Sequence, residues 1–201
     1  MTPPAPQSSS GQRVVNDFTI AVATVNGSGS ASSNTILAKT VFRMGVPVAP
    51  KNAFPSNIAG LPTWFIIRVN EQGYKSRTGH REVVIALNAA TVADDITSLA
   101  SGGVLIIDEA LPQAKAVGRD DIQVFSVPMA QIAKEYAPDV RLRKLLANMV
   151  YVGVAAELLG LDREVMGKVV ADQFASKEKI VKLNLDVVDA GIKYAQENFN
   201  A

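Results

Sequence analysis

The feature that most constrains the fold is a nearly unbroken apolar run over residues 17–25, which leads into a glycine- and serine-rich turn and then into a helical pattern. An apolar run of this length is typical of a strand covered on both faces, as in a parallel sheet. The turn reads Asn-Gly-Ser-Gly-Ser over residues 26–30. Beyond it, apolar residues of helical spacing continue to residue 44, and Gly45 is a good C-terminal stop. The chain therefore opens its fold with a strand, a tight turn and a helix.

Four later apolar runs also have the length of strands. They cover residues 64–69, 83–87, 104–107 and 122–127. A short helix is predicted over residues 90–100, with two following glycines as its end. Strands rich in Val and Ile that alternate with helices indicate an α/β fold, here a Rossmann-like layered fold with a mostly parallel sheet.

The last third of the chain is predicted to contain helices only. Capping residues mark three helix starts, at Asp139, Asp162 and Ser176. The final helix has a second apolar stripe, formed by Leu185, Val188 and Ile192. A helix that is apolar on two sides usually packs against something on both. We therefore expect a C-terminal group of helices whose last member exposes this stripe in the isolated chain and contacts another subunit.

Length and segment composition set the expected organisation and location. The chain has 201 residues, and at this size about 70% of the surface of the unfolded chain can be buried. Residues 1–15 are rich in Pro and Ser and are expected to form a disordered tail, whereas residues 16–201 form one domain. No segment approaches the roughly 18 to 20 apolar residues that span a bilayer, and the N-terminus lacks the features of a secretion signal. The expectation is a cytoplasmic protein that does not associate with membranes.

The charge and the reactive residues exclude several functions. The net charge is +1, which argues against a general nucleic-acid binder, because such proteins neutralise phosphates with clustered Lys and Arg. There are no cysteines and one histidine, His80. The chain therefore has no disulfide, no cysteine nucleophile, no ligands for an iron–sulfur cluster and no multi-histidine zinc site.

The turn at residues 26–30 is the first candidate binding site. It lies between a strand and a helix, where backbone N–H groups and the helix dipole favour an anion. The turn lacks the third glycine of a dinucleotide fingerprint and the Gly-Lys-Ser/Thr of a P-loop. Such a turn can also be purely structural, with the serines only capping the helix. The density of Ser and Asn, which are poor helix formers, favours ligand contact.

Three further segments have open interpretations. Residues 50–64 contain three prolines and are predicted to form a fixed-shape loop, which either helps to bind a ligand or simply connects two elements. Residues 71–81 are basic and are expected to form a solvated turn, with an anion contact as the alternative. Asp94 and Asp95 are expected on the exposed side of a helix. Asp108 ends a strand and is either a ligand contact or a capping residue.

Taken together, these segments resemble a known family. The similarity is carried by residues 25–39, 42–45, 50–52, 54–58 and 60–64, of which the Phe-Pro-Ser-Asn-Ile loop is the most specific. It resembles the gamma domain of 2-oxoacid:ferredoxin oxidoreductases, and within them most resembles the domain that opens the alpha subunit of 2-oxoglutarate:ferredoxin oxidoreductase. In that alpha subunit the chain continues into a thiamine-binding domain. The present chain is therefore expected to be either a fragment or a separate subunit.

The resemblance implies a thiamine-diphosphate enzyme that decarboxylates a 2-oxoacid, passes electrons through iron–sulfur clusters to ferredoxin, and forms an acyl-CoA. Thiamine diphosphate, its Mg²⁺ and the clusters are expected on other alpha-subunit domains or on a beta subunit. This domain is expected to contact coenzyme A and to be inactive alone. The residues that the resemblance and the turn assign to coenzyme A are Asn26, Gly27, Ser28, Gly29, Ser30, Ser33, Asn34, Lys51, Asn52, Asn57 and Gly60. Two alternatives stay open: a stand-alone Rossmann-like nucleotide-binding enzyme, and a purely structural assembly domain.

Overall fold

The computed structural model describes residues 16–53, 58–76, 79–175 and 177–199, and shows one six-stranded sheet packed between helices. The strands are β1 (Asp17–Val25), β2 (Val48–Ala53), β3 (Pro62–Asn70), β4 (Arg81–Ala86), β5 (Leu99–Asp108) and β6 (Gln123–Val127). The helices are α1 (Ser30–Arg43), α2 (Val92–Thr97), α3 (Met129–Lys134), α4 (Val140–Leu158), α5 (Arg163–Gln173) and α6 (Glu178–Asn198), with a 3₁₀ turn at Pro112–Lys115.

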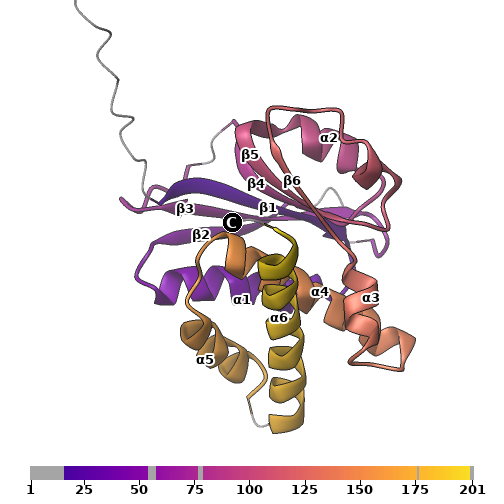
Figure 1. Cartoon of the computed structure of the whole chain (residues 1–201). Helices are drawn as coiled ribbons and strands as arrows, with labels where there is room; N and C mark the ends of the chain where they lie inside the picture. Colours follow the sequence, from indigo (N-terminus) through magenta and orange to yellow (C-terminus); the bar gives the residue numbers. More distant parts are fainter. Residues whose placement is uncertain (1–15, 54–57, 77–78, 176, 200–201) are drawn as a thin grey trace, which may run out of the picture.

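Both faces of the sheet are covered (Figure 1). Helices α1, α4, α5 and α6 lie against one face, and α2 lies over the other. Neighbouring residues of β1 show why its sequence is an unbroken apolar run. Ile20 and Val22 belong to the larger core beneath α1 and α4, whereas Ala21 belongs to the smaller core beneath α2. A strand with a core on each side needs apolar residues at every position.

The strand order is β2-β3-β1-β4-β5-β6. Strands β1, β4, β5 and β6 run parallel to one another. Strand β3 is antiparallel to both of its neighbours, β1 and β2. The α/β class, the mostly parallel sheet and the C-terminal helices are thus confirmed, and the antiparallel β2–β3 pair is an addition that the sequence pattern did not indicate.

Residues 50–64 were predicted to form a loop, and this prediction is wrong at both ends. Residues 62–64 begin β3. Residues 50–53 are also a strand. These residues belong to β2, in which Pro50 pairs with Ile67 of β3. Proline lacks the N–H that a central strand needs, but an edge strand has one side without a partner. Strand β2 is the last strand of the sheet and therefore tolerates the proline. Residues 54–57, including the predicted site residue Asn57, lie outside the described residues.

The predicted helix over residues 90–100 is shorter than expected. Helix α2 ends at Thr97, and β5 begins at Leu99 and runs through both glycines that were expected to stop the helix. Gly103 is required there because a Cβ would lie 2.8 Å from the carbonyl oxygen of Ala100. A glycine inside a strand pattern often marks such a close backbone approach.

The C-terminal helices confirm two of the predicted caps. The carboxylate of Asp139 accepts a hydrogen bond from the Leu142 N–H at 2.8 Å, and Asp162 accepts from the N–H groups of Glu164 and Val165. Ser176 lies outside the described residues.

The prediction of an exposed apolar stripe on the last helix is wrong. Val188 is fully buried, and Leu185 and Ile192 are half-buried against the larger core. The reason is a close crossing of α4 and α6 at Gly153 and Gly191. A Cβ at Gly153 would collide with the carbonyl oxygen of Val188 and come within 3.0 Å of the Gly191 Cα. Because the two backbones approach this closely, the second stripe is covered within the chain itself.

Candidate functional site

The turn between β1 and α1 depends on two glycines. Gly27 and Gly29 have φ angles of +86° and +81°, which side-chain-bearing residues rarely adopt. A Cβ at Gly29 would also collide with the side chain of Leu145. Gly29 is the N-cap of α1, no side chain caps the helix, and its first turn has no acidic residue. The N–H groups at this helix end therefore lack a side-chain acceptor, and the helix dipole makes the position favourable for an anion.

The serines of this segment do not cap the helix, because they are used in packing. Ser30 is buried, and its hydroxyl shares a 3.1 Å hydrogen bond with Thr24 of β1. The Ser28 hydroxyl donates to Ser30 at 3.1 Å. Ser33 is buried against α4 and donates to Met149 Sδ at 3.3 Å. Ser33, which was predicted as a ligand contact, thus faces α4.

Asn34 combines burial with a free donor. Its side chain is 3% exposed, and its Oδ1 accepts a 2.7 Å hydrogen bond from the hydroxyl of Tyr151 on α4. Burial raises the pKa of Tyr151, so the hydroxyl stays protonated and remains a donor. The accepting oxygen fixes the orientation of the amide, and no hydrogen bond within the described residues uses its Nδ2. The buried amide therefore has an NH₂ group available for a ligand.

A cavity of about 380 Å³ lies beside this amide, and we call it the turn cavity. The structure brings six of the predicted residues together in its lining: Asn26, Gly27, Gly29, Ser30, Asn34 and Asn52. Lys51 lies next to Asn52 on the exposed edge strand but does not line the cavity. The turn cavity is therefore a recess formed by the β1–α1 turn, β2 and β3, with several amide and hydroxyl side chains in its lining.

Asn26 and Gly60 fix the wall of this recess. The Asn26 N–H donates to the carbonyl oxygen of Leu61 at 2.8 Å, and its side-chain amide donates to that of Ile58 at 3.1 Å. The Gly60 N–H donates back to the Asn26 carbonyl oxygen at 2.9 Å. These bonds hold residues 58–61 against the turn, so both predicted residues have a clear structural role.

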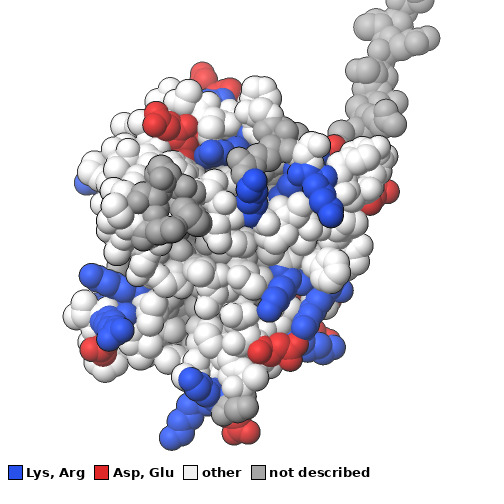
Figure 2. Space-filling view, turned by 180° about the vertical axis from the view of Figure 1, so that it is seen from behind, with Lys and Arg blue, Asp and Glu red and all other residues white. Residues whose placement is uncertain are grey.

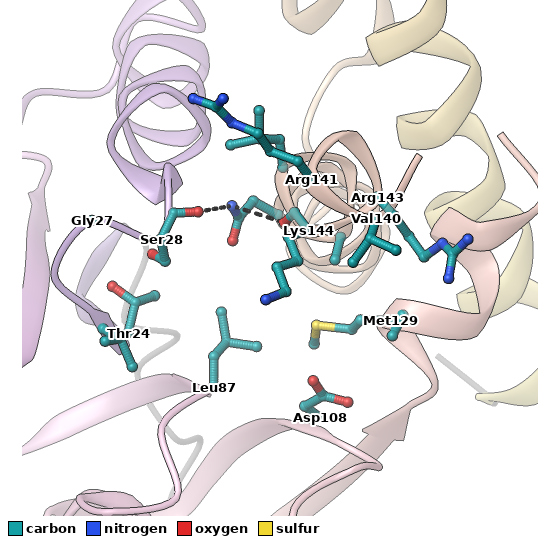
Figure 3. A pocket seen from close by; sticks show the side chains of 15 residues that line it. Thr24, Gly27, Ser28, Leu87, Asp108, Met129, Val140, Arg141, Arg143 and Lys144 are labelled. Atoms are coloured by element: carbon teal, nitrogen blue, oxygen red, sulfur yellow. Dashed lines mark hydrogen bonds between the residues drawn. The ribbon is translucent and has the colours of Figure 1, made fainter. Parts of the chain in front are cut away.

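A second and larger cavity, of about 710 Å³, lies on the other side of the turn, and we call it the strand-end cavity. It is bounded by the carboxyl ends of β1, β4 and β5 and by the start of α4. This edge is where open α/β sheets commonly bind ligands. Figure 3 shows the ammonium group of Lys144 pointing into the middle of this cavity, with Asp108 rising from the opposite side.

The basic residues of this cavity were not predicted from the sequence. Arg141, Arg143 and Lys144 line it, and their basic run directly after the helix cap Asp139 was the available signal. Arg143 is used internally, since its guanidinium donates to the carbonyl oxygens of Ala137 and Pro138. Among the described residues, the side chains of Arg141 and Lys144 form no ion pair and no hydrogen bond.

Two further polar residues, Asp108 and Asn148, line the strand-end cavity. Burial raises the pKa of Asp108, although a 3.1 Å hydrogen bond from the Ala110 N–H opposes this, and the nearby Glu109 raises it further. Asn148 of α4 donates to the Ser28 carbonyl oxygen at 3.1 Å and so attaches the turn to α4.

The other segments considered from sequence are structural. Asp95 was predicted to be exposed and is instead 1% exposed, because Trp64, Arg81 and Thr91 all donate to its carboxylate. Such a set of donors satisfies a buried charge. Asp94 is exposed, as expected.

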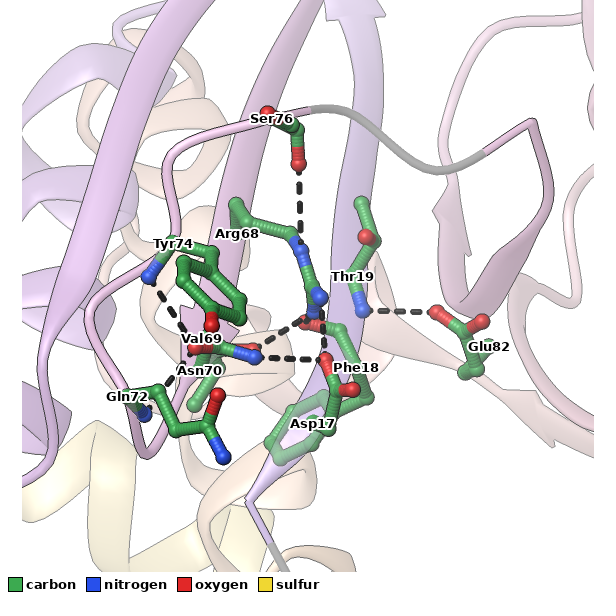
Figure 4. A network of polar contacts seen from close by, with 10 residues as sticks. All are labelled: Asp17, Phe18, Thr19, Arg68, Val69, Asn70, Gln72, Tyr74, Ser76 and Glu82. Atoms are coloured by element: carbon green, nitrogen blue, oxygen red, sulfur yellow. Dashed lines mark hydrogen bonds and ion pairs between the residues drawn. The ribbon is translucent and has the colours of Figure 1, made fainter.

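The stretch at residues 71–76 is held by a polar network (Figure 4). Buried Arg68 forms an ion pair with Asp17 and donates to the Ser76 carbonyl oxygen, while Asn70 Oδ1 accepts from the N–H groups of Gln72 and Tyr74. Asn70 and Arg68 lower the pKa of Asp17. Residues 77–78 of the basic segment are outside the described part.

The described residues indicate neither a metal cluster nor a membrane-spanning helix. Within the described ranges, no group of three or more His, Cys, Asp or Glu side chains is placed to hold a metal ion. None of the described helices combines the length and apolar character needed to cross a membrane.

Known proteins share this sequence pattern. Residues 19–194 match the family described as pyruvate ferredoxin/flavodoxin oxidoreductase. Ketoisovalerate oxidoreductase subunit VorA of Methanothermobacter thermautotrophicus is 26% identical over 182 residues, which cover 89% of this chain and 36% of that protein. Subunit alpha of 2-oxoacid:ferredoxin oxidoreductase 2 from Aeropyrum pernix is 24% identical, over 91% of this chain and 34% of the relative. The chain thus spans about a third of the length of these curated relatives.

Solved structures share the fold. The 2-oxoglutarate:ferredoxin oxidoreductase of Magnetococcus marinus, solved with 2-oxoglutarate, coenzyme A and succinyl-CoA bound, matches with a TM-score of 0.82 and 24% identity, over 93% of this chain and 32% of that one. The gamma subunit of keto/oxoacid ferredoxin oxidoreductase from Geobacter sulfurreducens matches with a TM-score of 0.72 and 19% identity, over 90% of this chain and 99% of that one. With nearly its whole domain matched in sequence, the chain belongs to the pyruvate ferredoxin/flavodoxin oxidoreductase family, as its resemblance to the gamma domain predicted.

Proposed function

We propose that this chain is a non-catalytic domain or subunit of a thiamine-diphosphate-dependent 2-oxoacid:ferredoxin oxidoreductase, in which it helps to bind coenzyme A for acyl-CoA formation. Its relatives are subunits of 2-oxoacid oxidoreductases, and a protein of the same fold is a separate gamma subunit. We take 2-oxoglutarate as the first substrate to test. The expected partners are the remaining alpha-subunit domains, a beta subunit and, through the complex, ferredoxin.

The observation that carries the coenzyme A proposal is the meeting of two anion-seeking features in the turn cavity. The uncapped start of α1 lines this recess together with buried Asn34, whose Nδ2 has no hydrogen-bond partner among the described residues. The helix end contributes about 0.3 to 1 kcal/mol towards binding a phosphate. Asn52 adds a neutral donor from β2, and Lys51 is close by on the same strand.

The charge distribution over the surface is compatible with an anionic ligand. The net charge is only +1, and the face seen from behind Figure 1 shows more basic than acidic side chains, with acidic groups among them (Figure 2). A local excess of positive charge raises the concentration of anionic ligands without a large net charge.

The chemistry of the reaction lies outside this chain. Thiamine diphosphate, bound elsewhere with its Mg²⁺, supplies the decarboxylation chemistry. The iron–sulfur clusters need thiolate ligands that a chain without cysteine does not have. The residues of this domain bind and orient coenzyme A, and the chain alone is expected to be inactive.

The test uses Asn52→Ala and Lys51→Ala in the enzyme assembled with its other subunits. Reduction of ferredoxin by 2-oxoglutarate is followed at varied coenzyme A, with pyruvate and 2-oxoisovalerate as alternative substrates. A lost contact to a charged group is worth about 1.5 to 3 kcal/mol, so the KM for coenzyme A should rise roughly tenfold or more while kcat stays the same. Asn198→Ala, an exposed amide at the far end of α6, is the matched control.

An unchanged KM in both variants would contradict the coenzyme A proposal and favour a domain that only assembles with other subunits. Ser33 and Asn34 are unsuitable for this test because their replacement disturbs the packing of α1 against α4.

A further inference from the structure

The turn cavity and the strand-end cavity are neighbours that share one wall. Thr24, Val25 and Gly27 line both of them. The turn therefore forms a ridge between two recesses, and the start of α1 lies on that ridge. If the central diphosphate of a ligand lies on this helix end, one end of the ligand extends into the turn cavity and the other end into the strand-end cavity.

The two recesses differ in size and lining. The turn cavity, at about 380 Å³, has the polar side chains of Asn26, Asn34, Asn52 and Thr63 in its lining. The strand-end cavity, at about 710 Å³, is lined by apolar side chains, among them Leu87, Met129, Val140 and Leu145. The smaller recess suits a narrow chain with amide groups, whereas the larger one suits a flat ring system that packs against apolar side chains.

Lys144 places a positive charge in this cavity, and this charge can bind a phosphate group attached to such a ring system. Its ammonium points into the strand-end cavity (Figure 3), and no described residue neutralises it by an ion pair. A lysine ammonium is a compact point charge that binds phosphate well. Asp108, on the opposite side, offers an acceptor to hydroxyl or amino groups.

We propose, building on the function proposed above, that the strand-end cavity takes the adenosine 3′-phosphate end of coenzyme A, with the Lys144 ammonium bound to the 3′-phosphate. The pantetheine arm then leaves through the turn cavity. In this arrangement Lys144 recognises the one phosphate that distinguishes coenzyme A from dephospho-coenzyme A.

The test compares Lys144→Gln with the unmodified enzyme, both assembled with the other subunits, on coenzyme A and on dephospho-coenzyme A. The variant should raise the KM for coenzyme A about tenfold, since it removes a charged contact, and should leave the KM for dephospho-coenzyme A unchanged. As a second probe, 3′-phosphoadenosine 5′-phosphate should compete with coenzyme A, and its inhibition constant should rise by the same factor. The control is Lys168→Gln, an equal loss of charge on the exposed side of α5 that lines neither cavity.

The outcomes separate this inference from the proposed function. Suppose that Asn52→Ala raises the KM for coenzyme A, but that Lys144→Gln changes the KM for coenzyme A and for dephospho-coenzyme A equally, or changes neither. The assignment of the adenosine end is then wrong, and the turn site stands. If neither variant changes the response to coenzyme A, both proposals fail.

Discussion

At the scale of single residues, the site depends on side chains that α4 places behind the turn. Asn148 holds the Ser28 carbonyl oxygen, and Tyr151 holds the side-chain oxygen of Asn34. Asn148 also lines the strand-end cavity, whereas Tyr151 lines neither cavity. Both hydrogen bonds help to fix the turn and the start of α1 beside the turn cavity. They are positioning residues in a region that the sequence predicts only as a helix.

Tyr151→Phe tests this arrangement with the loss of one oxygen atom. The buried Asn34 Oδ1 would lose its donor, so the free energy of unfolding should fall by about 1 to 3 kcal/mol. The freed amide can turn over, so the KM for coenzyme A should also rise while kcat stays the same. Tyr136→Phe is the control, because no hydrogen bond of the Tyr136 hydroxyl exists among the described residues. Loss of stability with an unchanged KM would reduce Tyr151 to a purely structural role.

At the scale of elements, the crossing of α4 and α6 sets the shape of the helical layer. Gly153 and Gly191 let the two backbones touch, and Val188 of α6 is buried there. The same packing places the start of α4 next to the ends of β1 and β5, which forms the strand-end cavity. A crossing far from the ligand thus determines where Lys144 lies.

Gly153→Ala should destabilise the protein strongly. The new methyl group would collide with the Val188 carbonyl oxygen, and because this neighbour is backbone it cannot move aside cheaply. Overpacking of this kind costs about 1 to 3 kcal/mol or more, measurable by thermal or denaturant unfolding. Gly167→Ala in α5 is the matched change, since its nearest neighbour is the flexible Arg163 side chain. There the gain in helix propensity, up to about 1 kcal/mol, should keep stability level or raise it. Equal effects of the two changes would refute the close crossing.

At the scale of the whole molecule, the antiparallel β2–β3 pair separates this fold from a dinucleotide-binding one. A nicotinamide site needs a second parallel strand beside β1, with an acidic residue at its carboxyl end for the ribose. Strand β1 has parallel β4 on one side, but its other side, where a dinucleotide-binding sheet has the strand with this acidic residue, is taken by antiparallel β3. The residue opposite Val25 on that side is Pro62, at the beginning of β3. The position that would hold the ribose carboxylate therefore does not exist among the described strands.

We therefore expect no micromolar binding of NADH to the full chain. The change in NADH fluorescence on titration measures it directly, with coenzyme A as a competing ligand. Micromolar binding that coenzyme A does not displace would favour the stand-alone nucleotide-binding enzyme over the oxidoreductase component.

The sequence by itself determined the elements whose signals are local. The buried strands at 17–25 and 104–107, the turn at 26–30, and the caps Asp139 and Asp162 all follow from patterns within a few residues. The resemblance added the family, and six residues chosen with its help do line one cavity.

Only the tertiary structure decided features that depend on partners distant in the chain. Pro50 is compatible with β2 because that strand lies at the edge of the sheet, and Asp95 is buried because Trp64 and Arg81 meet it there. Lys144 lies beside Ser28 because α4 packs against α1 and the turn. Patterns along the chain report on periodicity and turn chemistry, whereas pairing order and helix crossing arise from contacts between distant segments, which no local pattern encodes.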